Sequence, residues 1–122
     1  MRLVQVAVGV QDLDRAVAFY RDVVGLAHRA TYDPPGLAFF DLDGVRLLLD
    51  RGAPASLVYL GVEDLPATVA RLRAAGVVVE GEPHVIFTHD DDTLGPARTA
   101  EWMAFVRDSE QNLLGLVEQR AV

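Results

Sequence analysis

One pattern of apolar and polar positions occurs twice along the chain. Residues 3–10 (LVQVAVGV) alternate, with valine at every second position, and this period of two is typical of a β-strand. Asp12 follows as a candidate helix cap, apolar residues then recur at helical spacing as far as Val24, and Gly25 suits a left-handed helix end. The pattern predicts a strand followed by a helix.

The same pattern returns 52 residues later, where VGVQDLDRAVA (8–18) becomes LGVEDLPATVA (60–70). Asp64 is the second candidate cap, Pro66 stands in the first turn, where a missing N–H costs little, and Gly76 ends the helix. Strand-like runs follow each helix: GLAFFDLDG and VRLLLD in the first half, and VVVEGEPHVIF, EWMAFVRDSEQ and NLLGLVE in the second. The second half therefore predicts the order strand–helix–strand–strand–strand, and through the repeat the first half is given the same order.

Turn signals separate the last strands of each half, at Asp43-Gly44 and near Glu110-Gln111. Residues 88–99 (THDDDTLGPART) have no counterpart in the first half and predict a loop.

No linker-like or low-complexity segment divides the two halves. We therefore expect a single α+β domain over residues 1–122, with module one at about 1–52 and module two at about 56–120. A paired ferredoxin-like fold is the architectural alternative.

Composition and charge narrow the classes of partner. The formal net charge of −7 disfavours nucleic acid and anionic membrane surfaces, and the absence of cysteine removes disulfides and thiolate chemistry. The N-terminus meets Asp12 before any apolar block forms, and no run approaches the roughly 18 apolar residues of a membrane span. The expectation is a cytoplasmic protein without nucleic-acid or membrane partners.

Three segments together resemble a known family, namely VGVQDLDRAVAFYRDVVGL near the start, LAFFDLDGVRLLL in the middle and MAFVRDSEQNLLGLVE at the end. The chain resembles the vicinal oxygen chelate superfamily, which includes glyoxalase I, methylmalonyl-CoA epimerase, extradiol dioxygenases, fosfomycin resistance enzymes and bleomycin resistance proteins. The resemblance implies two βαβββ modules that form cupped mixed sheets around a cavity. It also implies a homodimer, with the cavity at or near its interface.

Enzymes of this superfamily usually hold a divalent metal with His, Gln or Glu from the first and last strands of the modules. Carried over residue by residue, the first-strand positions are Gln5 and Leu57, and the last-strand positions are Gly115 and Leu48, or Leu49 in the adjacent register. A catalytic metal normally needs about three protein ligands. The sequence therefore predicts no metal and no cofactor. Bleomycin resistance proteins are the relevant precedent, because they use the cavity without metal to sequester a toxic molecule.

Other side chains are candidates to line that cavity. Phe39, Tyr59 and Trp102 are large apolar groups on predicted strands. Arg46 is a candidate either to meet an anionic ligand or to pair with Asp50 two positions along.

The three histidines offer candidate acid–base chemistry. His28 is expected in a loop after the first helix, and His89 in an exposed acidic loop. His84 is expected on a strand beside the one that carries Glu101, which makes these two residues the candidate catalytic pair. Because His84 and His89 are five positions apart, they point to opposite faces of any one straight strand.

The sequence thus favours a metal-free homodimer that binds a small organic molecule, for example a resistance or sequestration protein. One alternative is a glyoxalase- or epimerase-type isomerase or lyase with atypical metal or acid–base residues, His84 and Glu101 among them. Another is a structural or regulatory dimer with a collapsed cavity.

Overall fold

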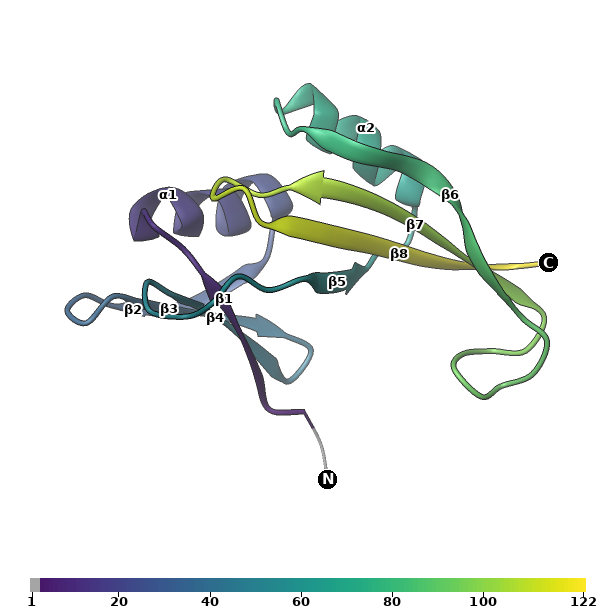
Figure 1. The fold of residues 1–122 in the computed structure, drawn as a ribbon, viewed down its shortest axis with the longest axis horizontal. Coiled ribbons are helices and arrows are strands. Elements are labelled where there is room, and N and C mark those ends of the chain that lie inside the picture. The colour runs from purple at the N-terminus through teal and green to yellow at the C-terminus, as the bar shows by residue number, and fades with distance from the viewer. Residues whose placement is uncertain (1–2) are drawn as a thin grey trace. The chain divides into compact units, whose positions relative to one another are not determined.

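The computed structural model describes residues 3–122, and these follow the predicted order twice (Figure 1). The elements of the first half are β1 (Gln5–Gly9), α1 (Leu13–Ala18), the π-helical segment η1 (Phe19–Val24), β2 (Ala27–Tyr32), β3 (Leu37–Leu42) and β4 (Val45–Asp50). Those of the second half are β5 (Val58–Gly61), α2 (Leu65–Ala74), β6 (Val79–His89), β7 (Thr99–Arg107) and β8 (Leu113–Ala121). Within the described part of the chain, no helix is long and apolar enough to cross a membrane.

The chain divides into two compact units. Unit 1 contains the chain as far as Val58 together with Asp108–Asn112, and unit 2 contains Tyr59–Arg107 and Leu113–Val122. The turn between β7 and β8, expected within module two, packs instead with unit 1.

Unit 1 is a four-stranded mixed sheet in the order β1-β4-β3-β2, with β1 and β4 parallel and the other pairs antiparallel. One sheet face packs against α1 and η1 through fully buried side chains, among them Val8, Leu13, Tyr20, Phe40 and Leu49. We call the opposite face, which carries Gln5, Phe39 and Arg46, the open face of unit 1. Strand alternation therefore separates the face that packs on the helices from the face that carries these three residues.

The helix and turn signals in unit 1 are confirmed. The Asp12 carboxylate accepts a hydrogen bond from the Arg15 amide at 3.0 Å, and Gly25 ends the helical segment with a left-handed φ of 93°. The expected turn holds Asp43 at a positive φ.

One expectation is wrong: His28 lies in β2, not in a loop. Because β2 is an edge strand with polar residues on both faces, its sequence lacks a clean apolar alternation.

Unit 2 is a four-stranded sheet in the order β5-β8-β7-β6, with β6–β7 and β7–β8 antiparallel. The Asp64 carboxylate caps α2 by accepting from the Ala67 amide at 3.0 Å. The buried residues that α2 shares with this sheet are Leu65, Val69, Leu72, Ala104, Val106, Leu114 and Leu116. The other face of this sheet, which carries Tyr59, Gly115 and Glu101, is the open face of unit 2.

The β7–β8 turn is bound to α1 and η1 by buried acidic side chains. Asp108 is 3% exposed, and its Oδ2 accepts from the Tyr20 hydroxyl at 2.6 Å. Burial, together with the Asp108 charge, raises the pKa of Tyr20, so that this hydroxyl stays protonated and donates. Asp108 Oδ1 also accepts from the amides of Glu110 and Asn112 at 2.8 Å, which closes the turn.

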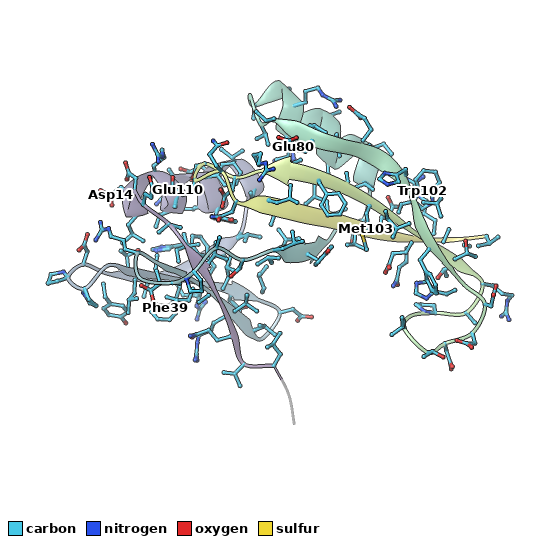
Figure 2. All side chains as sticks on the ribbon, in the orientation of Figure 1. Asp14, Phe39, Glu80, Trp102, Met103 and Glu110 are labelled. Carbon is cyan, nitrogen blue, oxygen red and sulfur yellow. The ribbon has the colours of Figure 1, made fainter. Side chains whose placement is uncertain are left out.

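Glu110 in the same turn lies at the N-terminal end of α1 (Figure 2). Its Oε1 accepts from the amides of Gln11 and Asp12 at 2.8 Å, and its Oε2 accepts from Arg15 Nε at 2.7 Å. Burial favours the neutral acid, but the hydrogen bonds from Arg15, Asp12 and Gln11 outweigh it and lower the pKa of Glu110 to about 2. The turn is thus held by a carboxylate that satisfies otherwise unpaired helix-end amides.

Candidate functional site

Three predicted ligand-binding residues lie together on the open face of unit 1. Gln5 on β1, Phe39 on β3 and Arg46 on β4 line a pocket of about 430 Å³ with Ala30 and Tyr32 of β2. The parallel register sets Gln5 directly beside Arg46. Sequence reasoning missed Ala30 and Tyr32, because their segment was not recognised as a strand. Once β2 is known, alternation places both on the same face.

The polar centre of this pocket is an Arg46–Gln5 pair. Arg46 Nε donates to Gln5 Oε1 at 2.9 Å, so Arg46 takes a partner 41 positions away rather than Asp50. The Asp50 carboxylate instead accepts from the Gly52 amide at 2.8 Å. The Arg46 residue is exposed, so its remaining N–H groups are available for an anionic or carbonyl oxygen.

Aromatic side chains border the Arg46–Gln5 pair. The Phe39 and Tyr32 rings meet edge to face, with centroids 6.1 Å apart. Tyr32 is 56% exposed, and Phe39 is half-buried. Apolar rings beside a few placed polar groups are the usual composition of a small-molecule site.

On the open face of unit 2, Tyr59 takes up the space beside Gly115. A Cβ atom at position 115 would lie 2.6 Å from Tyr59 Cδ1, which is closer than atoms can pack. The Tyr59 ring also meets Phe105, with centroids 6.2 Å apart. Gly115 therefore leaves room for the Tyr59 ring.

The residues at the four family ligand positions do not fit a metal. Leu48 is an apolar side chain only 8% exposed, and Leu57 is apolar and 44% exposed. Gly115 supplies no side chain, and the oxygen of Gln5 accepts from Arg46. Across residues 3–122, no three or more His, Cys, Asp or Glu side chains are grouped to hold an ion. The four positions therefore lack the donor atoms that a catalytic metal needs.

Trp102 lies on the helix-facing side of its sheet, not with Tyr59. It stands opposite Glu118 in the β7–β8 register, and Glu118 Oε1 accepts from the Leu65 amide at the start of α2 at 2.6 Å. The Arg120 guanidinium lies over the Trp102 ring, 4.7 Å from its centroid. The neighbouring Met103 (both labelled in Figure 2) points to the open face, because successive residues of a strand alternate.

The candidate pair His84 and Glu101 is not a cross-strand pair. The β6–β7 register, which shifts between Val85 and Phe87, sets His84 opposite Met103 and Glu101 opposite Phe87. His84 is exposed, and its Nδ1 contacts the Glu82 carbonyl at 2.7 Å.

Glu101 has another histidine beside it. His89 Nε2 lies 3.8 Å from Glu101 Oε1. His89 is the last residue of β6 and only 2% exposed, so its expected place in an exposed loop is wrong. The sequence offers no signal of this burial, because an acidic run that is typical of an exposed loop follows His89 directly.

Two βαβββ modules with four-stranded mixed sheets define the α+β class of the glyoxalase and bleomycin resistance fold. A sequence profile of the Glyoxalase/Bleomycin resistance protein/Dioxygenase superfamily matches residues 2–114. The chain belongs to this superfamily. Among curated proteins, no sequence matches the chain significantly.

Solved structures share this fold. A lactoylglutathione lyase from Agrobacterium tumefaciens is 25% identical, with 96% of this chain and 92% of that one covered and a TM-score of 0.72. TnmS3, an antibiotic binding protein from Streptomyces sp. CB03234, is 23% identical, with 97% and 95% covered and a TM-score of 0.72. A superfamily member from Sphaerobacter thermophilus is 18% identical, with 97% of each chain covered and a TM-score of 0.74.

Proposed function

We propose that this protein binds a small organic molecule in its cavity without a metal at the family ligand positions, as a sequestration or resistance protein. The observation that carries the proposal is the pocket of about 430 Å³ where Arg46 and Gln5 lie beside aromatic rings. The likeness to an antibiotic binding protein supports the same class of function.

The chemistry of the pocket indicates the kind of ligand to try first. A partly free guanidinium favours a carboxylate or carbonyl oxygen, and the Phe39 and Tyr32 rings favour a planar apolar body. Burial of that body contributes about 25 cal/mol per Å² of apolar surface. The first panel therefore holds aromatic carboxylates and polycyclic antibiotics that carry carbonyl groups.

We propose that the working form is a homodimer. The edge strand β6 exposes Val85, Ile86 and Phe87 at 44%, 47% and 47%, and an exposed apolar edge of this kind favours pairing with another chain. Sedimentation velocity at several concentrations measures the mass directly, and a monomer at every concentration would contradict the dimer. That the protein acts in the cytoplasm stays a prediction.

The binding test uses protein treated with EDTA and desalted. Thermal shift screens the panel, and calorimetry then measures Kd for each hit with wild type, Arg46→Met and Phe39→Ala. Arg21→Met is the matched control, because Arg21 is an exposed arginine that pairs with the adjacent Asp22. We expect weaker binding in the two pocket variants and an unchanged Kd in the control.

Two results would overturn the proposal. Hits that bind all four proteins equally would mean that the pocket is not the site. Ligand binding or turnover that appears only after metal is restored, and that Gln5→Leu removes, would favour an isomerase or lyase of the superfamily instead.

A further inference from the structure

His89 is the most unusual polar side chain in the described part of the chain. It is 2% exposed, and neither of its ring nitrogens has a hydrogen-bond partner among residues 3–122. Buried polar groups in proteins almost always have a partner. The Phe87 ring contacts the imidazole edge to face, with centroids 4.8 Å apart, and offers no polar atom.

One carboxylate oxygen lies near a nitrogen of this ring, and a second side chain contacts that oxygen. Glu101 Oε1 lies 3.8 Å from His89 Nε2, and the Gln119 amide nitrogen donates to the same Glu101 oxygen at 3.4 Å. A distance of 3.8 Å is too long for a hydrogen bond. Two atoms that share a zinc ion, at bond lengths of about 2.0–2.1 Å, lie about 3.4 Å apart in tetrahedral coordination. A small closing movement therefore brings this pair to the spacing of shared metal ligands.

Gly95 keeps the space beside these donors free of side-chain atoms. A Cβ atom at position 95 would lie 2.8 Å from the Gln119 amide nitrogen and 3.3 Å from His89 Nε2. The Gln119 side chain is exposed, so rotation of its amide presents oxygen in place of nitrogen.

The surroundings of His89 favour a cation. A pocket of about 300 Å³ opens against His89, and Asp90, Asp91 and Thr93 contribute to its lining. The chain as a whole carries a net charge of −7. Acidic side chains that line a pocket raise the local concentration of cations.

We propose that His89, Glu101 and Gln119 bind one divalent transition-metal ion, such as zinc, with water completing the coordination. Imidazole nitrogen and carboxylate oxygen are usual ligands of this class of ion, and the amide oxygen of Gln119 would be the third protein ligand. The three residues come from the ends of β6, β7 and β8, and none is at a family ligand position. The proposal is independent of organic-ligand binding, which is measured on metal-stripped protein.

The test is zinc titration of the full chain against a chromophoric chelator, with cobalt substitution as a spectroscopic check. We expect one ion per chain and a cobalt d–d spectrum in wild type. His89→Gln and Glu101→Gln each lose at least about 100-fold in affinity, since even outer-shell changes cost about 10–100-fold. His84→Gln is the matched control, because His84 is an exposed histidine on the same strand, and its Kd stays at the wild-type value.

Gln119→Leu, at an exposed position, keeps the test decisive if His89→Gln fails to fold, as judged by circular dichroism. It is expected to weaken zinc binding and to alter the cobalt spectrum. The proposal is overturned if zinc binds wild type and the folded ligand variants equally, or if no ion binds. It is also overturned if the tight site is lost in Gln5→Leu or His84→Gln instead, because the ion would then be held elsewhere.

Discussion

Replacement of Glu110 by glutamine tests the attachment of the β7–β8 turn to α1. The glutamate side chain is only 1% exposed and accepts from Arg15 and two helix-end amides. Glutamine is nearly isosteric, so its oxygen keeps the two amide bonds. Its NH₂ group then faces the Arg15 guanidinium, and because both groups are donors they cannot hydrogen-bond to each other. The change therefore removes a charge-assisted hydrogen bond with little change in shape.

The expected loss of stability in Glu110→Gln follows from the lowered pKa of Glu110. Hydrogen bonds from Arg15, Asp12 and Gln11 outweigh burial and lower the pKa of Glu110 from 4.5 to about 2. At about 1.36 kcal/mol per unit, this corresponds to at most about 3 kcal/mol of stability. Arg15 is 54% exposed, and solvent screens its charge, so we expect Glu110→Gln to cost about 1–3 kcal/mol at pH 7.

The pH dependence has a definite sign. A carboxylate whose folded pKa is depressed stabilises the fold above its unfolded pKa, and this contribution is lost as pH falls towards the folded value. Urea unfolding at pH 7, 5 and 3.5 should therefore show the difference between wild type and Glu110→Gln shrinking below about pH 4.5. Glu82→Gln, which breaks an exposed ion pair with Arg73, is the control and should cost less than about 1 kcal/mol. The reasoning would be refuted if Glu110→Gln and Glu82→Gln lowered the free energy of unfolding equally. It would also be refuted if the difference between wild type and Glu110→Gln were as large at pH 3.5 as at pH 7.

Three further substitutions test the structure. Tyr20→Phe removes a hydrogen-bond donor from buried Asp108 and should lower the free energy of unfolding in urea by about 1–3 kcal/mol. An unchanged free energy of unfolding would mean that this hydrogen bond contributes nothing to stability. Gly115→Ala should lower the free energy of unfolding by about 1–3 kcal/mol in thermal unfolding, and most of this loss should disappear in a Tyr59→Ala background. If Gly115→Ala costs the same in both backgrounds, the close approach of Tyr59 to position 115 is contradicted. Asp64→Ala should cost about 1 kcal/mol through loss of the α2 cap, with Asp64→Asn as the conservative comparison.

The repeated local pattern predicted most of the elements, because their causes are local. Asp12 and Asp64 cap helices through amides three positions along, and Gly25 ends a helix through its own φ. Strand alternation likewise depends on neighbouring residues alone. The segment 27–32 was missed because an edge strand with polar residues on both faces carries no such signal.

The candidate site was predicted only in part, because register decides which strand residues meet. Gln5 and Arg46 were singled out separately, but the parallel pairing of β1 with β4 made them partners. Alternation along β7 places Trp102 on the helix-facing side, with Ala104 and Val106. The shifted β6–β7 register sets His84 opposite Met103.

By itself the sequence determined the two-module α+β plan, its capped helices, and the absence of ligand side chains at three of the four family positions. Tertiary structure alone decided that the β7–β8 turn packs with unit 1 and that Tyr59 lies against Gly115. It also decided that His89 is buried beside Glu101. The physical reason is the range of the interactions. Capping and alternation act within a few residues, whereas burial and pairing of a side chain depend on segments tens of residues away.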